Sequence, residues 1–446
     1  MIIFALSGKS ILTSDYMHKI YYIFELLICS HILLFVFFEF TNMDFVISIE
    51  IIKKLYLPFT LINLAILFKR KFFTHFLLSI VFLIIGYSVK ENMGSEQVLN
   101  TVMFCIILSS LTLHDVLKTF VITIGLLLLV SLFMYFGEFF EKDFFNIRND
   151  SLRHSFGFCH SNVFGAACFF WIITLWCLLK NISSYLYTVI LLLSLCYVLT
   201  LFVDCRTAQL MSVFSICIFI LCFIYDYYLK KRQLTSIKYV LGLYLIFNIV
   251  FITAITIIAS IYFSFDSSFL TKLNTIFSHR IELSHNAIVK YGISFFGKVL
   301  TQTDTLASDL GAKSTTVEYE YIDAFYINVL LNYGIVSLSI YVLCYMIVCY
   351  KSLTSGNYRI AIALLIFSIY GVMELIFYNI SFNILLYLVF VSFVQKGSFR
   401  YNRFDKFISD RFDVLLNILK VNCFSRGYFN SIYTLVFQKN KNNNAF

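Results

Sequence analysis

Residues 119–136 read TFVITIGLLLLVSLFMYF, a run without a charged side chain. As an α-helix, a run of this length rises about 27 Å, close to the ~30 Å hydrocarbon thickness of a bilayer. Comparable runs recur along all 446 residues, of which 60% are apolar and 13% charged. Because an ordinary globular domain is roughly 45–50% apolar and about 25% charged, this composition excludes a soluble globular enzyme. The runs are also too long for the alternating strands of about 10 residues that build a membrane β-barrel.

The apolar runs predict an all-α, polytopic membrane helix bundle of about twelve transmembrane helices. A single proline, Pro58, and a mean hydropathy of +0.85 agree with one continuous bundle. Eleven helices is the alternative, because Lys53 and Lys54 interrupt the second run and the fourth and twelfth runs are short. The expected spans are residues 20–40, 45–68, 72–89, 98–113, 119–136, 163–179, 185–203, 208–229, 239–263, 324–350, 360–380 and 382–395.

The spacing of the runs predicts four parts of the chain: 1–263 with helices one to nine, 264–323 as a long external loop, 324–395 with helices ten to twelve, and 396–446 as a basic tail. In the first half of the loop, apolar residues recur at helical intervals and predict short amphipathic helices. The same spacing over 403–421 predicts an amphipathic helix that lies on the inner membrane surface.

Lysine and arginine are spread unevenly over the predicted connections. With the N-terminus inside, most of the 34 basic residues fall in segments placed in the cytoplasm, including the cluster at 69–71 and the tail. Cytoplasmic loops carry such an excess, so both termini are expected in the cytoplasm. The net charge of +9 is therefore explained by topology and the lipid bilayer, and no nucleic-acid partner is predicted.

Three predicted external segments place arginine at the outer edge of the membrane. These are Arg153 (with Arg148 nearby), Arg206 and Arg280. Guanidinium groups bind phosphate in a bidentate manner, so converging arginines at headgroup depth would suit a lipid diphosphate. The alternative is that each arginine pairs with a nearby acid, such as Asp204 or Glu282, and only orders a loop.

Candidate bases and acids lie in the same external segments. The histidines include His160 and His285, and an acidic run that ends at Asp323 precedes the tenth span. A solvated acidic loop is the alternative for that run. Glu374 differs because it falls inside the eleventh expected span, where a carboxylate usually faces a partner or a polar cavity. It is predicted either to stabilise the fold or to line a site.

Motifs for nucleotides and metals are missing from the sequence. It contains no GxxxxGK[ST], GxGxxG or paired Asp-x-Asp motif, no GxSxG or HExxH motif, and no CxxC pair. Nine of the twelve cysteines fall inside apolar runs, where cysteine behaves as a small hydrophobe. No cofactor and no metal site are predicted.

Five stretches between residues 150 and 385 carry the polar residues of the predicted external segments. They are RHSFGFCHSNVFG at 153–165, DCRT at 204–207, SHRIELSHNAIVKYGISFFGKVL at 278–300, DAFYINVLLNYGIV at 323–336 and GVMELIFYNISFN at 371–383. In this order they resemble the motifs of bacterial Wzy-type polysaccharide polymerases in the O-antigen polymerase and ligase superfamily. Ser161 stands where that family commonly has proline, and Asp204 and Cys205 replace its usual small residues. The first five spans match in hydropathy only.

The resemblance implies a multi-pass enzyme of the bacterial plasma membrane that acts at its outer face. Such enzymes join oligosaccharide repeat units carried on undecaprenyl diphosphate. Their expected protein partners are the flippase and the chain-length regulator of the same pathway. The resemblance implies that Arg153, Arg206 and Arg280 bind the diphosphate and that His160 and Asn162 shape the site. Glu374, if it lines the site, is expected to contact substrate. For the base, His285, Glu282 and Asp323 remain open. A polysaccharide ligase and a flippase of lipid-linked oligosaccharides are the alternative functions.

Overall fold

The computed structural model describes residues 23, 25–30, 32–33, 49–69, 73–93, 96–138, 146–148, 151–179, 183–224, 226, 235–264, 266–298, 300, 322–391 and 393. The chain divides into two units, Met1–Lys396 and Gly397–Phe446, and all of these residues belong to the first. The predicted tail helix and most of the first predicted span lie outside the described residues, as does the polar half of the external loop.

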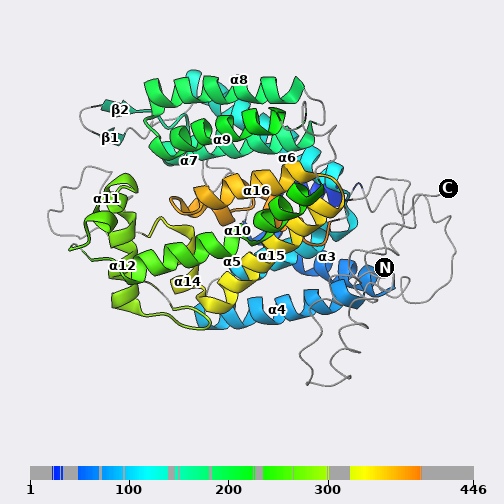
Figure 1. The fold of residues 1–446 in the computed structure, drawn as a ribbon. Helices are drawn as coiled ribbons and strands as arrows, with labels where there is room; N and C mark the ends of the chain where they lie inside the picture. The colour runs from blue at the N-terminus through cyan, green and yellow to red at the C-terminus, as the bar shows by residue number, and fades with distance from the viewer. Residues whose placement is uncertain are drawn as a thin grey trace. The chain divides into compact units, whose positions relative to one another are not determined.

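The described part of the first unit is helical apart from one small hairpin (Figure 1). Strands β1 (Asn146–Arg148) and β2 (Ser151–Arg153) pair antiparallel. The helices are α3 (Ile49–Lys69), α4 (Phe73–Met93), α5 (Gln97–Ile107), α6 (Leu113–Phe136), α7 (Ser161–Leu178), α8 (Ser183–Val198), α9 (Arg206–Ile224), α10 (Thr235–Ile261), α11 (Ser268–Ile276), α12 (Arg280–Tyr291), α14 (Phe325–Asn332), α15 (Gly334–Thr354) and α16 (Tyr358–Tyr370).

Six of the described helices are long and apolar enough to cross a membrane, as the sequence predicts for a helical membrane protein. They are α6, α7, α8 with its continuation to Val203, α9, the Val240–Ile261 part of α10, and α15. Helices α8, α9 and α10 expose many large apolar side chains, among them Leu193, Phe214 and Phe251. Such surfaces suit contact with lipid. The predicted count of twelve is not reached among the described residues.

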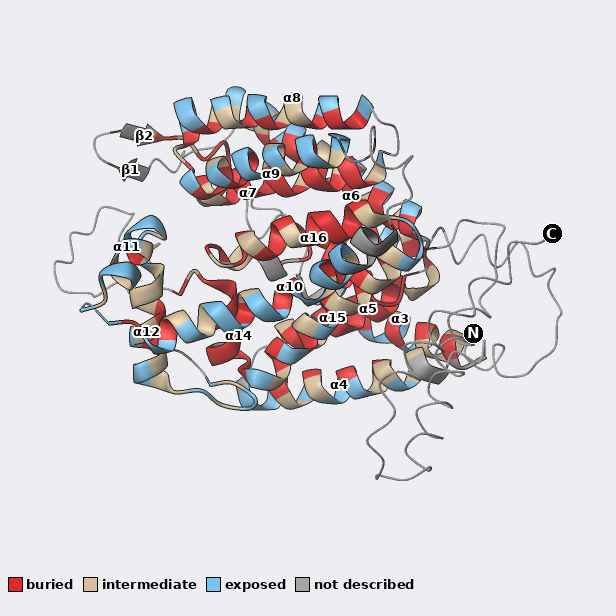
Figure 2. Cartoon of the chain, viewed as in Figure 1, coloured by how far each residue is buried: buried red, intermediate tan, exposed pale blue. Residues whose placement is uncertain are grey.

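Helix α7 forms the centre of the packing around the site. It contacts α6, α8, α9 and α16, and Figure 2 shows that both α7 and α16 are mostly buried. Phe169 of α7 stacks on Tyr370 of α16 at a ring-centroid distance of 5.4 Å, and Phe170 contacts the same ring edge-on at 5.0 Å. The small residues Gly165 and Ala166 allow close approach, since a Cβ at Gly165 would lie 3.0 Å from the Cys205 sulfur.

The three helices expected after residue 323 all differ from the described structure. The run at 324–350 breaks at Tyr333 because Gly334 adopts a φ of +84°. The run at 360–380 ends as α-helix at Tyr370, so Glu374 follows the helix rather than lying inside it. The described residues of 382–395 form turns and the 3₁₀-helix Ile384–Tyr387 instead of an α-helix.

Antiparallel neighbours bring a defined set of helix termini to one end of the unit. Helices α6, α8, α10 and α16 finish there, and α7, α9 and α14 begin there. The hairpin, α11 and α12 belong to the connections at this same end, seen at the left in Figure 1. The chemistry-bearing residues of the predicted external segments are therefore gathered at one end of the helices.

Candidate functional site

The segment RHSFGFC before α7 is largely buried, and hydrogen bonds to its backbone hold it in place. His154 donates its amide to the Phe202 carbonyl at 2.8 Å, and Ser131 of α6 donates to the Phe156 carbonyl at 2.8 Å. Phe156 and Gly157 have φ values of +50° and +85°, which turn the chain into the helix. These contacts fix the position of Arg153 at one side of the turn.

Arg153 is 6% exposed and donates hydrogen bonds to free carbonyls at the carboxyl end of the neighbouring helix. Its Nε donates to the Val203 carbonyl at 3.2 Å and its Nη2 to the Asp204 carbonyl at 3.0 Å. Asp204 ends a π-helical turn with a left-handed φ of +47°, a conformation that aspartate tolerates better than most residues. A cation at a helix C-terminus is stabilised by the unpaired carbonyls.

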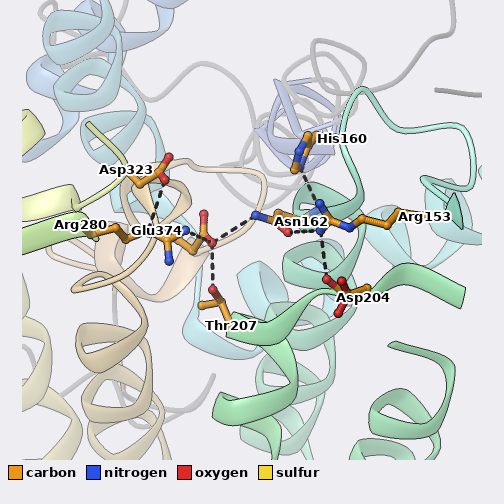
Figure 3. A network of polar contacts seen from close by, with 8 residues as sticks. All are labelled: Arg153, His160, Asn162, Asp204, Thr207, Arg280, Asp323 and Glu374. Carbon is orange, nitrogen blue, oxygen red and sulfur yellow. Dashed lines mark hydrogen bonds and ion pairs between the residues drawn. The ribbon is translucent and has the colours of Figure 1, made fainter. Parts of the chain in front are cut away.

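Asn162 joins Arg153 to the other half of the site. Its Oδ1 accepts from Arg153 Nη2 at 3.0 Å, and its Nδ2 donates to Glu374 Oε1 at 3.4 Å (Figure 3). His160 is the N-cap of α7, and its Nδ1 accepts the Asn162 amide at 3.1 Å. The cap therefore sets where α7 begins and orients the asparagine that bridges the two halves.

Glu374 is the centre of the network. Its Oε1 accepts three hydrogen bonds, from Asn162, from Thr207 Oγ1 at 3.0 Å and from Arg280 Nη2 at 3.0 Å. Its second oxygen, Oε2, takes part in none of these bonds (Figure 3). One carboxylate thus connects α7, α9 and α12 to the segment that follows α16.

Arg280 begins α12 and contacts two carboxylates at once. Its Nε donates to Asp323 Oδ2 at 3.2 Å, while its Nη2 donates to Glu374. Ser278 and His279 before it adopt φ values of +52° and +64°, so the chain turns sharply from α11 into α12. The Arg280 side chain is 13% exposed, which leaves the guanidinium largely shielded from water.

Two glycines anchor the far end of α12. Gly297 and Gly334 have φ values of +91° and +84° and meet where the chain after α12 crosses the break between α14 and α15. Ile335 donates its amide to the Ser294 carbonyl at 3.0 Å. A Cβ at Gly334 would lie 2.2 Å from the Phe295 carbonyl oxygen and 2.5 Å from the Gly297 nitrogen. Both glycines belong to motifs that the sequence analysis singled out.

The charges of this network balance when both carboxylates are ionised, because two arginines face two acids. Burial raises the pKa of Asp323, and the Arg280 guanidinium opposes that rise. Glu374 lies beyond α16 and outside every candidate span. Burial and the nearby Asp323 carboxylate raise its pKa, Arg280 and the Thr207 hydroxyl oppose that rise, and the net result is a pKa of about 7.

The structure brings five of the nine predicted site residues into one hydrogen-bonded network. A sixth contacts this network, and three lie elsewhere. Arg153, Asn162, Arg280, Asp323 and Glu374 are hydrogen-bonded in one chain, and His160 touches it through the α7 cap. The other three lie elsewhere: Arg206 is exposed at the start of α9, Glu282 bonds to Asn274 and His279, and His285 bonds to the Ser260 carbonyl at 2.9 Å.

Thr207 is the network residue that the sequence analysis did not select. It follows Arg206 in the DCRT motif, and one residue along a helix turns the side chain by about 100°. Arg206 consequently points outward while Thr207 is buried against Glu374. The DCRT motif does lie beside the network. The direction in which each side chain projects from α9 decides that Thr207, and not Arg206, contacts Glu374.

Within the described residues, no group of three or more His, Cys, Asp or Glu side chains is arranged to hold a metal ion. Comparison of the chain with protein-family models, with curated proteins and with solved structures finds no match. The candidate site is therefore characterised by its geometry: the buried Arg153, the largely shielded Arg280, two carboxylates and a bridging asparagine at one end of a helical membrane bundle.

Proposed function

We propose that this protein is a metal-independent polysaccharide polymerase of the bacterial plasma membrane. It would join oligosaccharide repeat units carried on undecaprenyl diphosphate into capsular, O-antigen or exopolysaccharide chains. The observation that carries the proposal is the network in which Arg280 and Arg153, from segments far apart in sequence, are connected through Asn162 and Glu374. The motifs that resemble those of Wzy-type polymerases supply most of this network.

The proposed reaction is a displacement at the anomeric carbon of the donor sugar. A hydroxyl of the acceptor unit forms the new glycosidic bond, and the bond from that carbon to the phosphate oxygen breaks with its electrons leaving on the lipid diphosphate. Fixed cationic donors stabilise such developing charge, and removing one typically costs about 10²–10³ in rate. Arg280 and Arg153 would supply this stabilisation, and Arg206 at the exposed start of α9 would contact the outer phosphate.

We place the network at the outer face of the membrane, in a bundle of about twelve helices with both termini in the cytoplasm. Lys351 near the end of α15 and Arg359 near the start of α16 support this orientation, since they lie at the opposite end of these helices from Glu374. Basic residues favour the cytoplasmic side. The pathway's flippase and chain-length regulator would be the protein partners.

Deletion of the gene tests the proposal, with surface and lipid-linked glycans sized by gel and mass spectrometry. A polymerase predicts that single repeat units persist on lipid or on the cell surface while long polymer disappears. Long polymer retained on its lipid carrier would identify a ligase instead. Single units confined to the cytoplasmic leaflet would identify a flippase.

A further inference from the structure

We propose that Glu374 is the general base that takes the proton from the acceptor hydroxyl. This inference rests on the proposed polymerase function. It assigns the proton-transfer step to a residue for which the sequence predicts only a role in the fold or in substrate contact.

The two oxygens of Glu374 have different environments. Oε1 is held by Asn162, Thr207 and Arg280, which fix the carboxylate in position. Oε2 accepts none of these bonds and belongs to a residue that retains 5% exposure. A base needs a fixed carboxylate with one oxygen available within hydrogen-bond reach of the proton it removes. Glu374 has this arrangement beside Arg280, the residue proposed to contact the leaving diphosphate.

Two of the alternative bases are committed to other contacts away from this network. Glu282 orders the turn between α11 and α12 through Asn274 and His279. His285 lies along α12 against the Ser260 carbonyl and the Phe263 ring. Neither contributes a contact to the chain of residues that joins the two arginines.

Asp323 remains as the alternative within the network. It contacts Arg280 only through Oδ2, and its side chain is 20% exposed against 7% for Glu374. Its single contact to the Nε of Arg280 makes it a positioning residue for that guanidinium. Glu374, which is more shielded and connected to both arginines, is better placed to act on the substrate.

Charged and titratable groups approach Glu374 from every element packed around it. Arg280 comes from α12, Asp323 precedes α14, and Arg153 acts through Asn162. From within the bundle, the hydroxyl of Tyr370 and the thiol of Cys205 interact electrostatically with the carboxylate. Burial raises the pKa of Glu374 toward the pH at which the enzyme works. A general base is most effective when its pKa lies near that pH.

With the proton transfer included, every bond that forms or breaks in the reaction is accounted for. The O–H bond of the acceptor hydroxyl breaks as its oxygen forms the bond to the anomeric carbon, and the proton moves to Glu374 Oε2. The bond between that carbon and the donor phosphate breaks, and lipid diphosphate leaves with the electron pair. The proton is then released to water at the outer face, so no oxidant, reductant or further reactant is needed.

The test measures polymerisation by the purified full-length protein in liposomes. Its substrate is lipid-linked repeat unit extracted from cells of the source strain that lack the gene. Rates are measured between pH 5 and 9 for wild type, Glu374→Gln and Thr207→Val. A base predicts a wild-type rate that rises with pH and levels off above about pH 7. Glu374→Gln should lose ~100-fold or more of the rate and should show no such rise.

Thr207→Val keeps the base but removes one hydrogen bond to its ionised form. Such a bond favours the charged state, so its loss raises the pKa of Glu374. The rising limb should therefore move to higher pH, whatever the height of the plateau, an effect that a purely structural role would not produce. This variant also keeps the inference testable if Glu374→Gln folds poorly.

Three results would overturn the inference. One is a Glu374→Gln enzyme that keeps the wild-type limb and rate, and another is a Thr207→Val enzyme whose limb does not move. Both leave the polymerase proposal intact, because wild-type protein still makes polymer. Failure of wild type to polymerise the lipid-linked units would overturn the proposed function and the base together.

Discussion

The Nη2 of Arg280 lies 3.0 Å from Oε1 of Glu374, although 94 residues separate the two in sequence. This ion pair connects α12, a helix outside the candidate spans, to the segment that follows α16. Its partners on both sides are themselves fixed, by Asp323 on the arginine and by Asn162 and Thr207 on the carboxylate.

Replacing Arg280 with alanine should abolish polymerisation without preventing membrane insertion. The change removes a cation proposed to stabilise the leaving diphosphate, a loss of about 10²–10³ in rate. Arg280→Lys should restore little, because an ammonium cannot reproduce the two directed bonds of the guanidinium fork. The readout is polymer length in a deletion strain that expresses each variant.

The matched control for Arg280 is Lys272→Ala. Lys272 is an exposed basic residue on α11, close in sequence but outside the network. It should support wild-type polymer length at equal expression. Wild-type polymer from Arg280→Ala would remove Arg280 from the reaction.

Asn162→Leu should destabilise the protein, because the substitution removes both the acceptor for Arg153 and a donor to Glu374. Leaving a buried polar group without its partner costs about 1–3 kcal/mol, more for charged groups. Asn162→Asp should also destabilise, since it places a second carboxylate against Glu374. Thermal unfolding of the detergent-solubilised protein measures both effects. An unchanged unfolding temperature in both variants would contradict the role of Asn162 as the bridge.

The sequence predicts features that depend on neighbouring residues better than features that depend on contacts between distant segments. Helix positions such as α6 and α7 are confirmed, because hydropathy is a local property of about 20 consecutive residues. The break at Gly334 was not predicted. A glycine inside an apolar run indicates a break only when another segment, here the one carrying Gly297, crosses at that point.

For the site, residue types were more predictable than pairings. The sequence predicts Arg153, Arg280 and Glu374 as site residues because placing a charged side chain in or beside a membrane costs free energy, and such residues usually have a function. Their partners could not be read from sequence, since Arg153 bonds to carbonyls 50 residues away and Glu374 to residues of three different helices. The choice of base also required the structure, because only geometry separates His285 from the network.

Chelation of divalent ions should leave the polymerisation rate unchanged. The proposed site uses guanidinium groups to stabilise the diphosphate, a task that enzymes of other classes assign to a divalent cation. The measurement compares protein treated with EDTA and untreated protein in the liposome assay at constant ionic strength. A loss of rate that added Mg²⁺ restores would contradict the metal-independent mechanism.

Gly334→Ala should lower both stability and polymerisation, because a methyl group there would lie 2.2 Å from the Phe295 carbonyl oxygen. The clash would displace the segment after α12 and with it the position of Arg280. Gly356→Ala is the matched control, since Gly356 has a similar φ of +77° but nothing within 4 Å of the added Cβ. Left-handed backbone alone costs about 1–2 kcal/mol in either variant. Thermal unfolding and polymer length should thus separate the two, and equal behaviour would show that the glycine contact does not position α12.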